Sequence, residues 1–456
     1  MQERRISRSS QSRAEEPPPA PTLATGATLR EGKLAWHNWS GAQHGQPSAR
    51  WAPADEDALR GVVRAAGELR VVGAGHSFSP LTSTNGTMIS LDRMSGLIRH
   101  DDENCRATLW AGTRLYDAGP LLHGIGQAMP NLGDIDRQSL AGVLSTATHG
   151  TGITLPCIAA RATGLRLVTA QGDVLQVSAE RDGDVFRAAA ISLGALGVIT
   201  QVTLQNVPAY RLHEQVRVLP LDKVLPEIDR WKRDHRNFEL WAFPYSRQAI
   251  VKTLETTAAE PTSEPKGGDS ADRLLKLCSE AARALPGMTS RLQGLIARFV
   301  KPTERVNWSY RIFPSSRNVR FNEMEYHLPE AAGATALDEV CSAVTKTGLN
   351  VFFPIEFRFV AGDDYWLSPF QGAARASIAV HQYYKQDYKP VFALAEPILR
   401  RHGGRPHWGK LHTADNEALR QLYPDFERFL RLRAELDPQG KLLNPYLRQI
   451  FGLTSP

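Results

Sequence analysis

The feature that most constrains this chain is a hydrophobic run that ends in two glycines and a histidine. In LRVVGAGHSFSPLTSTNGTMISLD, residues 69–92, the run LRVV leads into Gly73, Gly75 and His76, and hydroxyl side chains and a proline follow. The β-branched run predicts a strand, and the glycines predict a turn whose backbone N–H groups approach a bound group closely. Three kinds of loop begin in this way, and each implies a different function.

Two of these loops require features that the stretch lacks. A dinucleotide-binding turn needs a third glycine and then a helix whose N-terminus holds the pyrophosphate. Phe78 stands at the glycine position, and SPLTSTNG predicts a loop. A serine-hydrolase elbow, G-x-S-x-G, would make Ser77 the nucleophile, but Ser79 replaces the second glycine. A hydrolase built on Ser77 is therefore kept only as a remote alternative.

The third possibility is a flavin loop, in which glycines admit a diphosphate and the histidine stands at the flavin ring. A second stretch, GDIDRQSLAGVLSTATHGTGITLP at residues 133–156, favours this possibility. Its small residues predict a loop with a flat, donor-rich backbone surface, and Leu140, Val143 and Leu144 predict that it is anchored to a core. The small residues are Gly142, Ser145, Thr146, Ala147, Thr148, Gly150 and Gly152.

The composition describes an ordinary globular protein of two or three domains. The 456 residues are 42% hydrophobic, and the net charge of +6 comes from cations scattered among acids, so a nucleic-acid-binding module is only a remote alternative. No stretch approaches the roughly 20 apolar residues of a membrane span. Four separated cysteines predict neither a disulfide framework nor a metal site. Residues 1–33 predict a disordered tail without a signal peptide, and hence a cytoplasmic protein.

Hydrophobic periodicity predicts an α+β protein with two regions. In the first region we expect a helix at 54–68, strands at 69–75, 87–92, 106–112 and 164–178, and a helix, turn and strand at 184–207. In the second we expect aromatic-rich strands of an antiparallel sheet with one polar face, at 236–246, 320–329 and 350–366. The segment 255–273 is rich in Pro, Ser, Gly and acids, which predicts a mobile surface insertion.

Seven motifs in order give the chain a specific resemblance. They are NWSG (38–41), VVGAGHSFSP (71–80), SLAGVLSTATHGTG (139–152), LGALGVITQVTLQ (193–205), PIEFRFVAGDDYWLSP (354–369), GGRPHWGKLH (403–412) and DPQGKLLNPYL (437–447). Together they resemble the sugar-lactone oxidases that act on L-gulono- and D-arabinono-1,4-lactone, which are FAD enzymes of the vanillyl-alcohol-oxidase superfamily. The resemblance covers residues 34 to about 450 and omits the N-terminal tail and a variable insertion at 255–305.

The resemblance implies the two-domain flavoprotein fold of that superfamily. It implies a PCMH-type FAD-binding domain at 34–208, a cap domain with a large antiparallel sheet at 209–410, and a C-terminal segment at 411–456 that returns to the flavin. It also implies that His76 holds FAD covalently through the 8α carbon of the ring. The other cofactor-binding residues expected on this basis are Val72, Gly73, Ala74, Gly75, Ser77, Phe78, Ser139, Gly142, Ser145, Thr146, Thr148, His149, Gly150, Val198, His407 and Lys410.

The strand FFPIEFRF carries the candidate catalytic pair. Alternation places Glu356 and Arg358 on one face, and Phe353, Ile355, Phe357 and Phe359 on the other. The residues alone are equally compatible with a structural ion pair, but the resemblance places this Glu-x-Arg pair in the substrate site. Glu356 would accept the hydroxyl proton, and Arg358 would hold the lactone oxygens.

Three further residues are expected beside this pair. Lys410 would stabilise negative charge near N1 and O2 of the reduced flavin. Ser139 and His381 would contact the substrate. Glu323 and Glu325, in FNEMEYHLP, are expected to be ordinary positions of a cap-domain strand.

We therefore expect an FAD enzyme that oxidises the C2 hydroxyl of an aldono-1,4-lactone, to give ascorbate or an analogue, and that reduces O2 to H2O2. Two alternatives stay open. One is an alditol oxidase that acts on polyols such as xylitol or sorbitol. The other is an aldonolactone dehydrogenase that passes electrons to a cytochrome or quinone.

Overall fold

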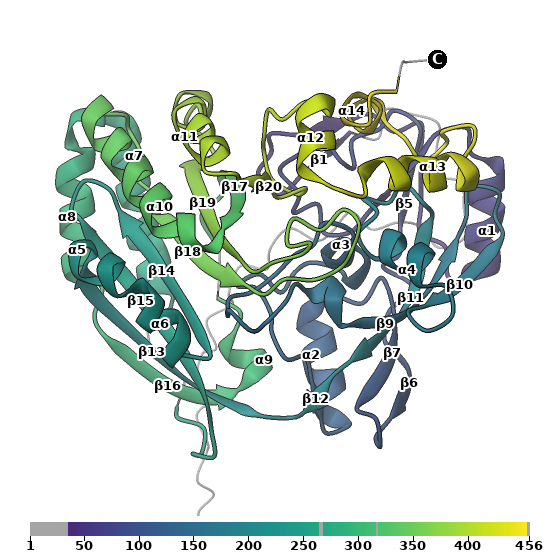
Figure 1. Cartoon of the computed structure of the whole chain (residues 1–456), viewed down its shortest axis with the longest axis horizontal. Coiled ribbons are helices and arrows are strands. Elements are labelled where there is room, and N and C mark those ends of the chain that lie inside the picture. Colours follow the sequence, from purple (N-terminus) through teal and green to yellow (C-terminus); the bar gives the residue numbers. More distant parts are fainter. Residues whose placement is uncertain (1–34, 264–267, 316–317, 454–456) are drawn as a thin grey trace, which may run out of the picture.

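The computed structural model describes residues 35–263, 268–315 and 318–453, so the predicted tail at 1–33 lies outside the described residues. The chain forms an N-terminal region and a second region built on one large sheet, drawn at the right and the left of Figure 1. Each region has its own main hydrophobic core. The division at residues 208 and 209 itself stays a prediction.

The N-terminal region combines two sheets. A parallel sheet has the order β3-β5-β4, and an antiparallel sheet has the order β10-β9-β11-β7-β6. The strands are β3 (Ala49–Trp51), β4 (Leu69–Val72), β5 (Thr87–Ser90), β6 (Leu97–Asp101), β7 (Arg106–Trp110), β9 (Ala162–Val168), β10 (Val174–Ser178) and β11 (Val198–Gln205). The helices are α1 (Glu56–Ala65), α2 (Leu115–Gly124), α3 (Leu140–Ser145) and α4 (Gly183–Ala190). Two short pairs are β1 (Trp36–His37) with β2 (His44–Gly45), and β8 (Gln127–Ala128) with β12 (Val207–Pro208).

The second region is an eight-stranded antiparallel sheet in the order β16-β13-β15-β14-β18-β19-β17-β20. Its strands are β13 (Arg211–Pro220), β14 (Asn237–Phe243), β15 (Gln248–Thr257), β16 (Thr303–Trp308), β17 (Phe321–Pro329), β18 (Ile355–Val360), β19 (Arg375–Tyr383) and β20 (Arg405–Pro406). Its helices include α5 (Leu221–Val224), α6 (Ile228–Asp234), α9 (Ser309–Ile312), α10 (Gly333–Thr347) and α11 (Lys389–Arg401). The three aromatic strands expected from the sequence are confirmed.

The two faces of this sheet differ in chemistry. Because side chains alternate along a strand, Met324, Tyr326 and Leu328 of β17 share one face. They pack with Ile355 and Phe357 of β18 against apolar residues of α5, α10 and α11. The opposite face carries the charged and polar residues of the same strands and looks toward the N-terminal region, so it is buried without being apolar.

The C-terminal segment packs back onto the N-terminal region. Helices α12 (Asn416–Leu422), α13 (Phe426–Leu436) and α14 (Pro445–Ile450) are drawn at the upper right of Figure 1, with the N-terminal region. The N–H of Leu69 in β4 donates to the carbonyl of Lys441 at 2.9 Å, and the Asn444 amide donates to the Pro80 carbonyl at 2.8 Å. Residues 441 and 444 therefore hold the start of β4 and the segment that follows the glycine turn.

Three local predictions are wrong. Residues 140–145 form helix α3 rather than a loop, because Leu140, Val143 and Leu144 recur at helical spacing and are buried. The segment 255–305 contains the ends of β15 and β16 and two helices, α7 (Gly268–Ala284) and α8 (Thr289–Phe299). In α7 the buried Cys278 and Ala282 recur at helical spacing, which a composition-based expectation overlooks.

Phe353 is the third exception. It lies outside β18 in a cluster with Phe321 and Tyr383, because Pro354 follows it and the strand begins only at Ile355. Among the described helices, none is long and apolar enough to cross a membrane. All four cysteines are free thiols, and three of them are buried.

Candidate active site

A groove with an empty volume of about 950 Å³ lies where β4 ends. It is bounded by the glycine turn after β4, by α3 and by the turn before β11. The predicted cofactor-binding residues that line it are Val72, Gly73, Ala74, Gly75, His76, Ser77, Ser139, Gly142, Ser145, Thr146 and Val198.

Two glycines shape the wall of this groove. A Cβ at Gly73 would lie closer than 3.0 Å to the hydroxyl of Ser139, which caps the N-terminus of α3. Gly75 has a φ of +68°, in the left-handed region that favours glycine. Residues 73–86 contain no helix, so the dinucleotide turn and the Ser77 hydrolase elbow both lack the helix that they need.

His76 projects from this wall with an unusual environment. Its Nδ1 is buried and has no hydrogen-bond partner among the described residues, and its ring lies 5.4 Å from that of Trp39. Burial and the nearby charges of Arg114, Lys410 and Arg137 lower the pKa of His76 to about 4. The imidazole is therefore neutral at physiological pH, which is the nucleophilic form.

Some predicted cofactor-binding residues lie outside the lining of the groove. They are Phe78, Thr148, His149, Gly150, His407 and Lys410. Phe78 is buried against Trp39 and Phe321. The backbone after α3 turns toward the large sheet, where the N–H of Gly152 donates to the carbonyl of Phe359 at 2.7 Å, and this turn takes residues 148–150 away from the groove.

Glu356 and Arg358 lie, as predicted, on the polar face of the large sheet. The Arg358 Nη2 donates to Glu356 Oε1 at 2.6 Å and to Asp134 Oδ2 at 3.0 Å, and its Nε donates to Glu239 at 2.9 Å. Lys252 contacts Glu239 at 2.6 Å and Asp134 at 3.3 Å. We call Asp134, Glu239, Lys252, Glu356 and Arg358 the arginine cluster.

The arginine cluster contains three carboxylates and two cations, all buried. Burial raises the pKa of Glu356, and the charge of Arg358 opposes this while Asp134 adds to it. The carboxylates around Arg358 raise its pKa against the opposing effect of burial, so the guanidinium stays charged. The sequence analysis missed Asp134, Glu239 and Lys252. Glu239 and Lys252 are cross-strand neighbours, so their pairing can be predicted only once the register of β14 and β15 is known.

Lys410 lies between two further carboxylates on the same sheet face. Its Nζ is 2.5 Å from Glu323 and 3.7 Å from Glu325, and it lies 5.1 Å from the centre of the Phe78 ring. Burial alone would raise the pKa of Glu323, but the charges of Lys410 and His381 lower it to about 2. Glu323 and Glu325 were expected to be ordinary strand positions. Their alternation with the apolar Met324 and Tyr326 was the available signal for a buried polar face.

The two clusters meet at His381. Its Nε2 lies 3.5 Å from Glu323, and ligand atoms of Glu323, Glu356 and His381 all lie within 4.8 Å of one another. Among the donors that the structure describes, both partners of Glu356, the Trp241 Nε1 at 3.0 Å and Arg358, bind its Oε1. Oε2 of Glu356 is therefore open to a hydroxyl of a bound molecule.

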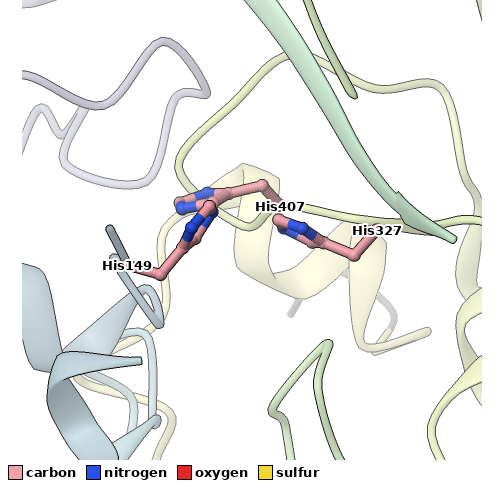
Figure 2. Close-up of side chains that lie close together, drawn as sticks. All are labelled: His149, His327 and His407. Atoms are coloured by element: carbon pink, nitrogen blue, oxygen red, sulfur yellow. The ribbon is translucent and has the colours of Figure 1, made fainter. Parts of the chain in front are cut away.

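Three buried histidines, His149, His327 and His407, have ring nitrogens within 4.8 Å of one another (Figure 2). Both nitrogens of His149 face acceptors, the Gly150 carbonyl at 2.8 Å and Glu325 at 3.0 Å. Nδ1 of His407 accepts from the N–H of Gly409 at 3.0 Å, so its other nitrogen carries hydrogen in the neutral ring. Nε2 of His327 is buried without a partner among the described residues, but with both nitrogens of His149 and Nδ1 of His407 engaged, this cluster does not suit a metal ion.

Sequence comparison supplies the family. Residues 47–178 match the FAD binding domain family, and residues 202–450 match the D-arabinono-1,4-lactone oxidase family. The chain belongs to the D-arabinono-1,4-lactone oxidase family. It is an FAD-dependent oxidoreductase that acts on CH–OH donors.

Similar proteins cover nearly the whole chain. L-gulono-1,4-lactone dehydrogenase of Mycobacterium tuberculosis is 37% identical over 91% of this chain and 99% of its own. L-gulonolactone oxidase of Bos taurus is 33% identical over 92% and 98%, and alditol oxidase of a Streptomyces species is 31% identical over 91% and 98%. A solved structure of a solvent-stable cholesterol oxidase, 18% identical, superposes with a TM-score of 0.79 over 92% of this chain and 97% of that chain. The predicted fold class is confirmed.

Proposed function

We propose that this enzyme oxidises the C2 hydroxyl of an aldono-1,4-lactone to the 2-keto lactone, with FAD held covalently through His76 and O2 reduced to H2O2. The observation that carries the proposal is that the segment of Lys410 joins the glycine turn of the groove to the charged sheet face. The carbonyl of Gly409 accepts from the N–H of Phe78, two residues after His76, at 2.7 Å, and the Lys410 ammonium contacts Glu323, a neighbour of Glu356.

The groove suits FAD in two respects. A Cβ at position 73 would crowd the Ser139 hydroxyl at its wall, and His76 presents a buried nitrogen without a partner among the described residues. When bound, the flavin supplies the two-electron acceptor for the substrate C–H bond. His76 would hold the ring, and the backbone around Gly73 and Ser145 would hold the remainder of the cofactor.

Glu356 is the proposed acceptor of the hydroxyl proton. Its Oε1 is fixed by Trp241 and Arg358, so the free Oε2 has a defined position for a hydrogen bond with the C2 hydroxyl. The raised pKa of Glu356 makes its carboxylate a stronger base than an ordinary exposed one.

The remaining predicted residues orient the substrate and balance charge. Arg358 would donate to the lactone oxygens, while Ser139 from the groove and His381 from β19 would bind hydroxyls. Lys410 would stabilise negative charge at N1 and O2 of the reduced ring. Asp134, Glu239 and Lys252 would keep Arg358 in place.

A substrate and acceptor panel tests the proposal. The purified enzyme would be assayed with L-gulono-1,4-lactone, D-arabinono-1,4-lactone, xylitol and sorbitol, with H2O2 detected directly. We expect lactone turnover with O2. Polyol turnover without lactone turnover would favour the alditol oxidase, which the Streptomyces relative supports.

The acceptor is tested separately. Lactone turnover with a dye or cytochrome c but no H2O2 would favour the dehydrogenase, which the mycobacterial relative supports. We also propose a cytoplasmic location, and fractionation of cells that express the full chain would test it.

A further inference from the structure

We propose that His149 is a positioning residue for Lys410, and that it acts by engaging Glu325 so that the lysine stays paired with Glu323. The inference rests on the proposed function, because it assumes that the place of the Lys410 ammonium matters for oxidation. It gives His149 a task other than the cofactor binding expected from the sequence.

Glu323 and Glu325 flank the Lys410 ammonium in a similar way. In each carboxylate, one oxygen faces the lysine and the other faces a histidine. Glu323 gives Oε2 to Lys410 at 2.5 Å and Oε1 to His381 at 3.5 Å. Glu325 gives Oε2 to Lys410 at 3.7 Å and Oε1 to His149 at 3.0 Å.

The two histidines are held in the same manner. His149 directs its other nitrogen to the backbone carbonyl of Gly150 at 2.8 Å, and His381 directs its other nitrogen to the carbonyl of Pro354 at 3.3 Å. Carbonyl and carboxylate oxygens only accept hydrogen bonds, so both nitrogens of His149 carry hydrogen and its ring is an imidazolium. His149 therefore contributes a positive charge to a pair buried on both sides.

The distances show which carboxylate holds the lysine. Lys410 is 2.5 Å from Glu323 but 3.7 Å from Glu325, although both carboxylates are buried and both are ionised. The difference follows from their other partners, since Glu325 is already neutralised by His149 at 3.0 Å. Without that charge, Glu325 would be left with Lys410 as its main counter-ion and would draw the ammonium away from Glu323.

The position of His149 makes this pair a link between the two regions. His149 follows α3, whose residues line the groove, whereas Glu325 belongs to β17 of the large sheet. The groups that face His149 are Glu325 and His327 from β17, His407 from the segment after β20, and Phe370. Figure 2 shows the three histidines. Burial keeps the pKa of His407 down at about 3 and that of His327 below its usual range, so neither supplies the charge in its place.

A double-mutant cycle tests the proposal on the FAD-loaded enzyme. The variants are His149→Asn, Glu325→Gln and the two combined, and the measurements are flavin content and the rate of flavin reduction by L-gulono-1,4-lactone. We expect full flavin content in all three, because neither residue lines the groove. His149→Asn should slow reduction by about 10- to 100-fold, as a displacement of about 1 Å does. Glu325→Gln should slow reduction far less than His149→Asn does, and the double variant should recover most of the loss.

The recovery separates positioning from a merely structural role. If His149 only filled space, the double variant would be at least as slow as His149→Asn, and that result would overturn the proposal. Equal reduction rates in His149→Asn and wild type would overturn it as well. His412→Asn is the matched control, because His412 is a half-buried histidine that is bonded to Tyr446 in the C-terminal segment. It should lower stability without slowing flavin reduction.

Two further measurements do not depend on turnover. With ¹⁵N-labelled histidine, the wild type should show both ring N–H signals of His149; both should disappear in His149→Asn, and one of them in Glu325→Gln. The midpoint potential of the flavin should fall in His149→Asn and return in the double variant. An inactive wild type that still shows the imidazolium signals would refute the proposed function alone, whereas an active wild type without them would refute the role of His149.

Discussion

The neutral imidazole of His76, buried and without a partner at Nδ1 among the described residues, is the residue on which the covalent flavin depends. His76→Ala removes the only nucleophile proposed for this bond. We expect the variant to fold and to bind FAD that acid precipitation releases into the supernatant, whereas wild-type colour should stay in the pellet. Colour in the pellet of His76→Ala would require another attachment residue. Because the pKa of His76 is lowered to about 4, attachment should not decline until the pH falls toward that value.

Glu356 is the residue on which proton removal depends. Glu356→Gln keeps the shape and the acceptor oxygen for Trp241 and Arg358, but it cannot accept a proton. We expect flavin reduction to slow by about 10²- to 10⁴-fold while the visible spectrum stays nearly unchanged, as stopped-flow absorbance would measure.

The pH dependence of Glu356→Gln gives a second criterion. Burial raises the pKa of Glu356, so the rate of flavin reduction in the wild type should increase as the pH rises through that raised pKa. This increase, the acidic limb of the pH profile, should be absent in Glu356→Gln. Glu304→Gln, which alters an exposed carboxylate paired with His213, is the control and should keep it. A wild-type rate in Glu356→Gln would place the substrate elsewhere.

At the scale of elements, local patterns predicted most strands but not the residues that complete the site. The run LRVV followed by glycines predicted β4 and its turn, because β propensity and glycine act within a few residues. Glu323 and Glu325 were missed because their task depends on Lys410, far along the chain. The pairing of Glu239 with Lys252 depends on a register that no local signal supplies.

Helix α3 is a case in which local composition predicted the wrong conformation. Its Gly and Ser residues, and the Thr residues that follow it, favoured a loop, but three buried apolar side chains at helical spacing and the Ser139 cap outweigh that composition. Packing against the core, rather than intrinsic propensity, decides the conformation of so short a helix.

The contact between the end of β4 and the start of α3 gives a prediction at this scale. Gly73→Ala places a methyl group closer than 3.0 Å to the Ser139 hydroxyl, so the turn or the cap must move. We expect a loss of stability of about 1–3 kcal/mol and weaker retention of FAD, measured by thermal unfolding and flavin content. Adding Ser139→Ala should relieve the overlap, and Ser139→Ala alone measures the lost cap. Unchanged FAD retention in Gly73→Ala would mean that the turn relaxes freely.

At the scale of the whole molecule, the site is formed by two regions that each bring part of the charge. The groove and His76 belong to the N-terminal region, and Glu356, Arg358 and Glu323 belong to the large sheet. Asp134 crosses from the first region to bind Arg358 and Lys252 of the second. The regions are therefore joined through buried ion pairs in the site itself, so their docking and the charge of the site depend on each other.

Asp134→Asn tests this dependence. Burial is the main cause of the raised pKa of Glu356, and the negative charge of Asp134 raises it further. Removing that charge should lower the pKa, so the acidic limb of flavin reduction should move to lower pH. The same change leaves Lys252 and Arg358 without one buried partner and should cost up to about 3–5 kcal/mol of stability, seen as a lower unfolding temperature. Asp338→Asn is the control: Asp338 lies on α10 and pairs with Arg247. This variant should lower stability without shifting the acidic limb of the pH profile. A limb that stayed in place or moved to higher pH in Asp134→Asn would show that the two regions do not share their electrostatics.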